Sequence, residues 1–321
     1  MIHPLPSGTR DVLPDESREL RTITDAMRGV FEHHGYGEVW TPAIEYESVV
    51  GRMDGGRGVY RLFDDHGEVL LLRSDMTVPI ARLAATRYAP EAFPLRLSTF
   101  AHVYRGVTPH RGQMRETLQA GVELLGLGAP EGTAEVLAVL CEALDAVGLR
   151  DYRIGLGDAA LYPALLRAFD VPAETQDRLL DTLVRRDHVA LEEQVAALGL
   201  DSDQARLLAR VPQTRGGRDL VVDAAPGPVA DALDGLRQVL DRLDPAVADR
   251  VIFDLGLIRD RGYYTGAVFE VYAAGVGMPL GGGGRYDDLL ARFGRDHPAA
   301  GFALSVDRVH LALAAETEVG A

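Results

Sequence analysis

The chain has 321 residues and a formal net charge of −15, from 33 basic and 48 acidic residues. This length can bury a large core, so we expect one main domain with an appended or inserted second unit. Its basic residues other than histidine are all arginine, which excludes a lysine Schiff base, a lysine nucleophile and a phosphate-binding lysine, and the acidic balance argues against an extended nucleic-acid footprint.

The first half of the chain predicts a helix, short strands and then a long hairpin. The expected elements are a helix over 16–34, strands at 39–40 and within 60–72, a helix over 77–88, a strand pair over 95–125, a helix over 133–147 and a strand over 152–156. The first helix begins after a proline and ends at Gly35, which is a common C-terminal signal. Period-2 patterning and turn residues indicate the strands.

The second half turns almost wholly helical between residue 159 and about residue 244. Strands return over 251–257 and 264–272, and a helix is predicted over 302–315. Strands, a helical block and strands again favour an α+β domain interrupted by a helical insertion. We therefore expect a core made of residues 1–161 and 249–321, with an insertion over 162–248.

The number of cysteines and the opening residues indicate in which cellular compartment the protein is expected. Cys141 lies in an apolar-periodic helix and is expected to pack in the core. One cysteine excludes an intrachain disulfide or a cysteine-rich zinc site, as is typical of a reducing cytoplasm. The opening residues show no basic head followed by an apolar run, and no segment is long and apolar enough to span a membrane. A cytoplasmic protein is expected.

Two glycine patterns and the histidines do not predict cofactor chemistry. The stretch 155–160 matches G-x-G-x-x-A, but a helical region follows where a dinucleotide fold needs a second strand, so we interpret it as a tight strand-to-helix turn. The glycines at 281–284 lack a following lysine and are expected to let the backbone pass close to a ligand or a neighbouring strand. The nine histidines show no metal-ligand spacing, and we expect no metal and no cofactor.

The most informative segment is the hairpin that includes YRGVTPHRGQMRETLQAGVE at 104–123. Side chains alternate along a strand, so Gln119, Gly121 and Glu123 share one face, while Leu118, Val122 and Leu124 do not. An amide and a carboxylate beside a glycine make a polar floor with room for a small ligand. Taken alone, these residues favour an ordinary half-exposed strand of an antiparallel sheet.

Four blocks in order change that interpretation. They are LLRSDMTVPIAR at 71–82, the hairpin, LIRDRGYYTGAVFE at 257–270, and GGGGRYDDLL from 281 with GFALSVDR from 301. Together they make the chain resemble the catalytic core of histidyl-tRNA synthetase, a class II aminoacyl-tRNA synthetase, over residues 6–308. The resemblance implies an antiparallel sheet flanked by helices, on which an amino acid and ATP would bind side by side.

The amino-acid half of that site maps well onto this sequence. By the resemblance, the ammonium group would bind Asp75 and Thr77, the carboxylate Gln119 and Arg259, and the imidazole Glu123 and Tyr264, with Tyr263 as a wall. The donors and acceptors suit such a ligand. Asp75 is one methylene shorter than the glutamate expected there. Consecutive Tyr263 and Tyr264 both line a pocket only with a bulge or turn, and core packing is an equal alternative for Tyr263.

The nucleotide half departs from the family. Arg105 and Arg308 fall where the family places its nucleotide-binding arginines. However, Val107 replaces a glutamate and Gln113 an arginine, so an acceptor and a charge are lost. The segment 260–262 reads Asp-Arg-Gly instead of Gly-Leu-Asp, and Ser305 replaces a glycine. We expect a vestigial nucleotide site at Arg105, Gln113 and Arg308.

Only 13 residues follow Arg308, fewer than the roughly 100 that an anticodon-binding domain would need. The combination resembles the ATP phosphoribosyltransferase regulatory subunits, a family of synthetase paralogues. The resemblance implies a non-catalytic regulator of histidine biosynthesis that binds histidine and a short-form catalytic subunit, without tRNA, in a hetero-oligomer (a hetero-octamer) containing a dimer of this chain. The alternatives are a tRNA-independent ligase that forms histidyl-adenylate, and a histidine-sensing module with another partner.

Overall fold

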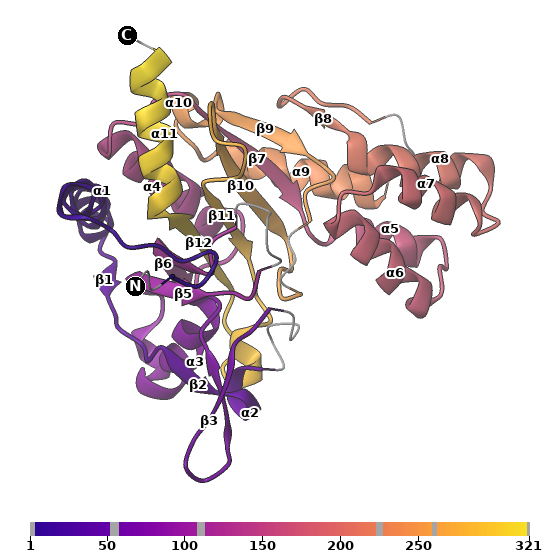
Figure 1. Ribbon diagram of the computed structural model, residues 1–321. Helices are drawn as coiled ribbons and strands as arrows, with labels where there is room; N and C mark the ends of the chain where they lie inside the picture. The colour runs from indigo at the N-terminus through magenta and orange to yellow at the C-terminus, as the bar shows by residue number, and fades with distance from the viewer. Residues whose placement is uncertain (1–3, 52–57, 108–112, 223–226, 259–261, 320–321) are drawn as a thin grey trace.

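The computed structural model describes residues 4–51, 58–107, 113–222, 227–258 and 262–319. Its centre is a nine-stranded sheet in the order β1-β5-β6-β12-β11-β10-β7-β9-β8 (Figure 1). The strands are β1 (Gly37–Glu38), β5 (Leu95–Tyr104), β6 (Glu116–Leu125), β12 (Ala299–Ser305), β11 (Gly281–Arg285), β10 (Ala267–Ala273), β7 (Tyr152–Asp158), β9 (Val251–Asp254) and β8 (Arg215–Gly216). Neighbours are antiparallel except β1 with β5 and β7 with β9, so the predicted α+β fold with a largely antiparallel sheet is confirmed.

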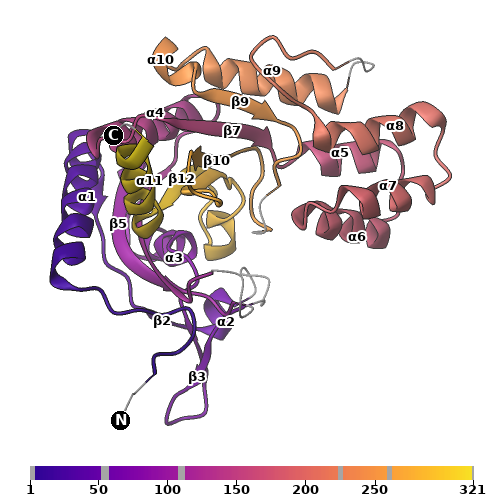
Figure 2. The same ribbon diagram turned by 45° about the horizontal axis from the view of Figure 1, so that its top comes forward.

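One face of the sheet is covered by three long helices. They are α1 (Pro14–His33), α4 (Glu131–Ala146) and α11 (Val306–Val319), which lie side by side in Figures 1 and 2. Their apolar residues join those of the central strands in one core, where Phe31 stacks on Phe100 at 5.6 Å between ring centroids. Cys141 of α4 is fully buried in this core, and burial raises the pKa of its thiol to about 11.

A smaller sheet packs near the other face. It consists of β2 (Ile44–Tyr46), β4 (Val69–Leu72) and β3 (Arg61–Phe63), with α2 (Glu47–Val50) beside it. The helix α3 (Thr77–Arg87) and two short 3₁₀ turns, η1 (Pro90–Ala92) and η3 (Leu290–Phe293), complete this region. A second apolar cluster, with Ile80 and Leu290 in it, holds α3 against the central sheet.

The helical block between β7 and β9 projects from one side of the molecule (Figure 2). It contains α5 (Leu161–Ala168), α6 (Ala173–Val184), α7 (His188–Ala196), α8 (Ser202–Arg210), η2 (Val211–Gln213), α9 (Pro228–Leu240) and α10 (Pro245–Ala248). Buried leucines on these helices, such as Leu166 and Leu208, belong to the same apolar cluster as the sheet. The short strand β8 lies inside the block and pairs with β9. The insertion bounds of 162–248 stay a prediction.

Some expected elements differ from the structure. The predicted helix over 302–315 is a strand up to Ser305 and a helix only from Val306. β12 lies between β11 and β6 and is buried on both faces, so its sequence shows a continuous apolar run that periodicity does not separate from a helix. Gly155 and Gly157 lie within β7, not in the turn that we predicted for them. Among the described residues, no helix has the length and apolarity that a membrane crossing requires.

Candidate functional site

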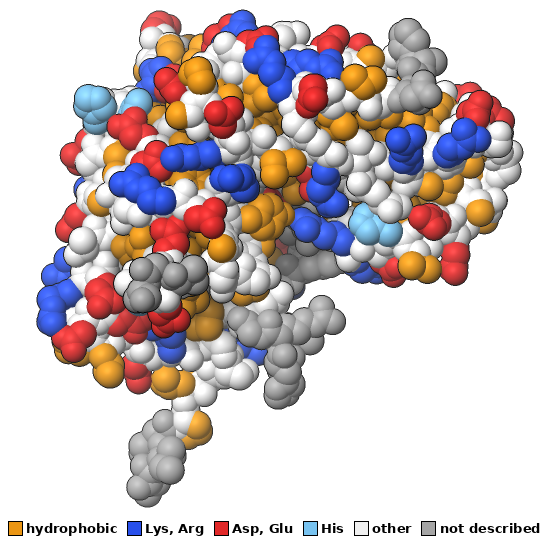
Figure 3. Space-filling view, turned by 90° about the horizontal axis from the view of Figure 1, so that it is seen from above, with side chains coloured by type: hydrophobic (Ala, Val, Ile, Leu, Met, Phe, Trp, Pro, Cys, Tyr) orange, Lys and Arg blue, Asp and Glu red, His pale blue; other side chains and the backbone are white. Residues whose placement is uncertain are grey.

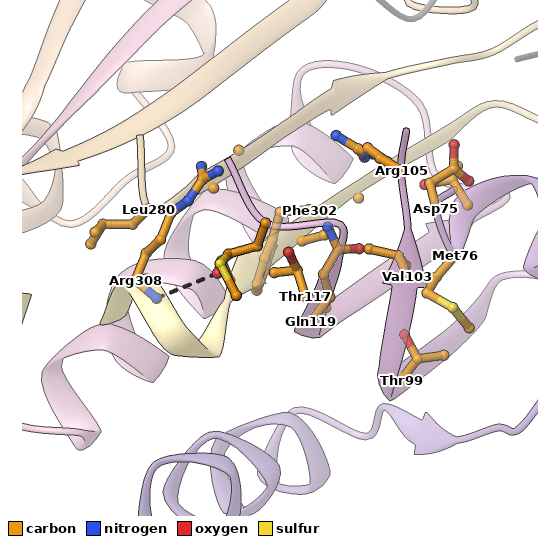
Figure 4. A pocket seen from close by; sticks show the side chains of 18 of the residues that line it. Asp75, Met76, Thr99, Val103, Arg105, Thr117, Gln119, Leu280, Phe302 and Arg308 are labelled. Atoms are coloured by element: carbon orange, nitrogen blue, oxygen red, sulfur yellow. Dashed lines mark hydrogen bonds between the residues drawn. The ribbon is translucent and has the colours of Figure 1, made fainter. Parts of the chain in front are cut away.

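A pocket of about 540 Å³ opens on the face of the central sheet opposite the three long helices (Figure 4). Its floor comes from β6, β11 and β12, and its walls come from the segments before α3 and before β10. Every described residue that the sequence predicted for the two ligand halves lines this one pocket. Arg259, with its neighbours 260 and 261, lies outside the described residues.

The alternation predicted for the hairpin strand is confirmed. Gln119, Gly121 and Glu123 of β6 line the pocket, while Val122 and Leu124 between and beyond them are buried in the main core. β5 pairs with the whole of β6 and β12 pairs with it over residues 119–125, so the register of the part that carries Gln119 and Glu123 is fixed from both sides. The Glu123 side chain lines the bottom of the pocket, and only 4% of the residue's surface is exposed.

Glu123 is the electrostatic centre of the amino-acid end. The hydroxyl of Thr77 donates a hydrogen bond to its Oε1 at 2.7 Å, and the hydroxyl of Tyr286 donates to its Oε2. Burial raises the pKa of the Glu123 carboxyl to about 7, and the two hydrogen bonds oppose that rise. Burial also raises the pKa of Tyr286 well above its usual value, so this residue stays a donor. Near neutral pH, Glu123 can therefore accept a proton from a ligand or share one with it.

Tyr286 is the residue that sequence reasoning missed. It follows β11 directly, within the GGGGRYDD block, and is 2% exposed. Its ring meets that of Tyr263 edge-on, with centroids 5.8 Å apart. The block itself is conspicuous, but an aromatic residue after a glycine run carries no signal of a partner 163 positions away in sequence.

The residue opposite Glu123 on the neighbouring strand is Gly301, and the space it leaves is needed by the Glu123 side chain. It pairs with Glu123 across the β12–β6 ladder. A Cβ atom at Gly301 would lie 1.8 Å from the Glu123 Oε2 atom and 2.5 Å from the Val122 carbonyl oxygen. The glycine thus leaves the space that the carboxylate occupies.

Asp75 and Thr77 reach the pocket from the start of a helix. Thr77 is the first residue of α3, and Asp75 lies two residues before it. The Asp75 Oδ1 atom accepts a hydrogen bond from the Val78 backbone N–H at 3.1 Å, which fixes the start of the helix. Both residues line the pocket, and Asp75 is buried, so the structure does bring them together.

Tyr263 and Tyr264 also both line the pocket, although they are consecutive. They lie in a non-strand segment before β10, which meets the expected need for a bulge or turn. Their ring centroids are 4.9 Å apart. Tyr263 is 5% exposed and belongs to the second apolar cluster, so it packs in the core and walls the pocket at once.

The side chain of Gln119 has a buried polar atom whose hydrogen bonding is unsatisfied. Its Oε1 atom is buried and has no hydrogen-bond partner among the described residues. Buried polar atoms are normally hydrogen-bonded, so this side chain is suited to meet a polar group inside the pocket. In Figure 4 it lies beside Thr117 near the middle of the pocket, between Arg308 and Asp75.

At the nucleotide end the two predicted arginines contact the backbone. Arg105 Nε donates to the Ser74 carbonyl oxygen at 3.0 Å, and Arg308 Nη1 donates to the Pro279 carbonyl oxygen at 2.7 Å. Val107, Gln113 and Ser305, the residues that depart from the family pattern, line the same pocket. Among the described residues, no group of three or more His, Cys, Asp or Glu side chains is placed to hold a metal ion.

Comparison with known proteins agrees with this geometry. The family model of histidyl-tRNA synthetase matches residues 8–309. An ATP phosphoribosyltransferase regulatory subunit from Symbiobacterium thermophilum is 45% identical over 316 residues, which are 96% of this chain and 79% of that protein. A second one, from Desulforamulus reducens, is 39% identical over 96% of this chain and 79% of its own length.

Solved structures give the same result. A structure described as an ATP phosphoribosyltransferase regulatory subunit/histidyl-tRNA synthetase, from Bacillus halodurans, is 33% identical with a TM-score of 0.87, over 98% of this chain and 84% of that one. A histidine–tRNA ligase subunit from Alicyclobacillus acidocaldarius is 32% identical with a TM-score of 0.81, over 99% of both chains. The chain belongs to the histidyl-tRNA synthetase-like family, among the ATP phosphoribosyltransferase regulatory subunits.

Proposed function

We propose that this protein is the regulatory subunit of a short-form ATP phosphoribosyltransferase, which it binds and activates at the first step of histidine biosynthesis. The observation that carries the proposal is the identity of 33–45% to proteins of that name over 95–96% of the chain. The protein acts in the cytoplasm, as part of a hetero-oligomer that contains a dimer of this chain, and without tRNA.

Histidine is the ligand of the amino-acid end. Its imidazole meets Glu123 and Tyr264, its ammonium group meets Asp75 and Thr77, and its carboxylate meets Gln119 and Arg259, with Tyr263 as a wall. Two features support this assignment: the hydrogen-bonded and buried Glu123, and the unpartnered Gln119 Oε1 atom. A carboxylate with a pKa of about 7 suits a ring whose own pKa is about 6.5.

Regulation requires only that histidine binds two states of the assembly with different affinities. The catalytic subunit holds this chain in an active arrangement, and histidine in the pocket shifts the population towards a less active one. By reciprocity, the assembly state that inhibits turnover also binds histidine more tightly.

The chain has no catalytic activity of its own. The nucleotide end supports this part of the proposal, because Val107 offers no acceptor and Gln113 no charge at positions that line the pocket. Arg105 and Arg308 alone do not supply the set of partners that adenylate formation needs.

The experiment is the turnover of a short-form ATP phosphoribosyltransferase from the same organism, with and without this chain, each titrated with histidine. Strong stimulation that histidine reverses is the expected result. If the chain gives no stimulation but catalyses histidine-dependent exchange between ATP and pyrophosphate, it is a histidine-activating ligase and the proposal is wrong.

A further inference from the structure

The two tyrosine-bearing segments at the amino-acid end of the pocket are joined to each other through Thr265. This residue follows Tyr264 directly, in the segment before β10. Its backbone N–H donates a hydrogen bond to the Arg285 carbonyl oxygen at 2.9 Å, and its Oγ1 atom accepts one from the Asp287 backbone N–H at 2.9 Å. Arg285 and Asp287 are the two neighbours of Tyr286 in sequence. One threonine thus fixes the segment of Tyr264 against the segment of Tyr286.

The side chain of Arg285 is a buried cation beside this joint. Figure 3 shows arginine and acidic side chains interspersed over the surface of one face of the molecule. By contrast, only 3% of the Arg285 side chain is exposed, and its Nη2 atom lies 2.7 Å from the Asp287 Oδ1 atom. The same Nη2 atom donates a hydrogen bond to the Leu127 carbonyl oxygen at 3.1 Å. Burying a guanidinium group is costly even when it is paired, so what this ion pair provides is a fixed arrangement of the backbone.

Asp287 connects the ion pair to β12. Its Oδ1 atom also accepts a hydrogen bond from the Ala299 backbone N–H at 2.9 Å. The Tyr286 backbone N–H in turn donates to the Ala299 carbonyl oxygen at 2.9 Å, and Ala299 is the first residue of β12. The backbone around Tyr286 is therefore held by β12 as well as by Thr265. Its hydroxyl reaches Glu123 from a position that both of them determine.

Two glycines bring the Tyr264 ring and the Glu123 carboxylate close together. Glu123 pairs with Gly301 across β6 and β12, and Gly301 pairs with Gly284 across β12 and β11. A Cβ atom at Gly284 would lie 2.9 Å from the Tyr264 Cδ1 atom, so this glycine leaves space for the ring, as Gly301 does for the carboxylate. Neighbouring strands are about 4.8 Å apart. A small movement of the tyrosine segment would therefore change the gap between the ring and Glu123.

We propose that Thr265 is a positioning residue of the amino-acid end, which sets the affinity of the pocket for an imidazole ring. It does so by holding Tyr264 and Tyr286 at fixed distances from Glu123. Neither Thr265 nor the buried ion pair beside it belongs to the described residues that line the pocket, so both act through the tyrosines. The inference rests on the proposed function, because it takes histidine as the ligand.

An imidazole ring requires such positioning. Its two nitrogens point in different directions, and each needs a partner at hydrogen-bond distance. Glu123 and Tyr264 are the proposed partners of the ring, and they come from β6 and from the segment before β10. A binding group that drifts by more than about 0.5 Å leaves its productive geometry. The joint at Thr265 prevents this drift between two segments that are far apart in sequence.

The experiment is calorimetric titration of the full chain with histidine, in the wild type and in Thr265→Val. Valine has the shape of threonine but offers no acceptor to the Asp287 N–H. We expect the Kd for histidine to rise about tenfold in Thr265→Val, and Thr265→Ser, which restores the acceptor, to recover most of that loss. If Thr265→Val does not fold, Thr265→Ala takes its place, since it also removes the acceptor.

Thr24→Val is the matched control. The Thr24 hydroxyl also makes a hydrogen bond with the backbone, to the Arg21 carbonyl oxygen at 2.9 Å. It lies in α1, on the face of the sheet opposite the pocket, and is buried. This substitution should leave the Kd for histidine unchanged. Thermal unfolding of every variant verifies that it is folded at the temperature of the titration.

A double substitution separates positioning from a general loss of stability. Tyr286→Phe removes the hydroxyl that donates to Glu123. If Thr265 acts by placing that hydroxyl, the Kd of the double variant Thr265→Val/Tyr286→Phe should rise by clearly less than the product of the two single effects. Independent effects would multiply. If Tyr286→Phe does not fold, the comparison of valine with serine at position 265 decides.

Three results would overturn the inference: a Kd that Thr265→Val leaves unchanged, a Kd that Thr265→Ser raises as much as valine does, or single effects that multiply in the double variant. A wild-type chain that does not bind histidine would remove the inference together with the assignment of histidine to the pocket. A wild-type chain that binds histidine but does not activate a catalytic subunit would contradict only the regulatory role, and the comparison of the variants would still hold.

Discussion

The two ends of the pocket differ in the hydrogen bonds that hold their side chains. At the amino-acid end, Glu123, Thr77 and Tyr286 are joined by side-chain hydrogen bonds and enclosed by the sheet. In the nucleotide half, the side chains of Arg105 and Arg308 donate hydrogen bonds, among the described residues, only to backbone carbonyl oxygens. At the amino-acid end, hydrogen bonds between the side chains hold each of them in one orientation. The nucleotide half keeps its arginines but lacks the acidic and polar side chains that accompany them in the family pattern.

The difference teaches which part of an inherited site is under structural constraint. A satisfied buried network holds each donor and acceptor in one orientation, and it rejects a ligand that leaves any of them unpaired. Arginines that contact the backbone alone keep their charge and position without selecting one nucleotide. Changes at the first end should therefore have large effects, and changes at the second end small ones.

The largest effect is expected from the titration of Glu123. The folded chain holds a proton on this carboxyl up to about pH 7, whereas the unfolded chain releases it near pH 4.5. Unfolding between these values releases a proton, so wild-type stability should fall as pH rises from about 4.5 to about 7. Relative to Glu123→Gln, the loss should approach roughly 3 kcal/mol and stay constant at higher pH.

Urea denaturation of the wild type and Glu123→Gln at several pH values between 4.5 and 8 provides the measurement. Carboxyls whose pKa is lowered, such as Glu38 and Glu135, act in the opposite direction in both proteins, so the difference between the two curves isolates Glu123. A difference that does not change with pH would show that Glu123 is ionised throughout.

The next effect concerns the histidine response. Glu123→Ala should raise the histidine concentration needed for inhibition on the order of 100-fold, because a hydrogen bond to a charged group is lost, while activation of the catalytic subunit persists. The measurement is turnover of the assembled enzyme against histidine concentration. Alanine also leaves the Tyr286 hydroxyl without its acceptor, so the fold is checked by the temperature of unfolding. Unaltered inhibition would place histidine sensing elsewhere.

A smaller effect is expected where the backbone makes room for that carboxylate. Gly301→Ala places a Cβ atom against Glu123 and the Val122 carbonyl oxygen and should destabilise the chain by about 1–3 kcal/mol. Gly235→Ala is the matched control, since Gly235 is exposed in α9 and a Cβ atom added there would meet nothing within 4 Å. It should stabilise the helix by up to about 1 kcal/mol. Chemical denaturation of both variants gives the comparison, and equal stabilities would mean that β12 shifts freely.

The sequence predicted which residues line the amino-acid end, but it did not predict the hydrogen bonds between them. Alternation along β6 was enough to place Gln119 and Glu123 on one face, because a strand between two others has a single register. The partnership of Glu123 with Tyr286 depends on strand order, which pairs β6 with β12 and β12 with β11. No local pattern encodes that order, so the tyrosine was missed.

The fold class followed from the succession of strands, helices and strands, but β12 did not. A strand buried on both faces has the same continuous apolar sequence as a buried helix. The sequence therefore predicts a helix from Phe302, although the helix begins at Val306. The same error concealed that Ser305 ends β12 at the pocket wall, immediately before α11 begins.

The smallest effect is expected at that junction. The Ser305 Oγ atom accepts a hydrogen bond from the Arg308 backbone N–H at 3.4 Å, which is long for a helix cap. Ser305→Gly should change the free energy of unfolding by only a few tenths of a kcal/mol, since glycine is tolerated at this position. It restores the glycine of the family pattern, yet Val107 and Gln113 remain in the pocket wall. Exchange between ATP and pyrophosphate should therefore stay absent in this variant. If exchange appeared, one hydroxymethyl group would be all that separates the nucleotide end from a working site, and the contrast between the two ends would be one of access and not of lost partners.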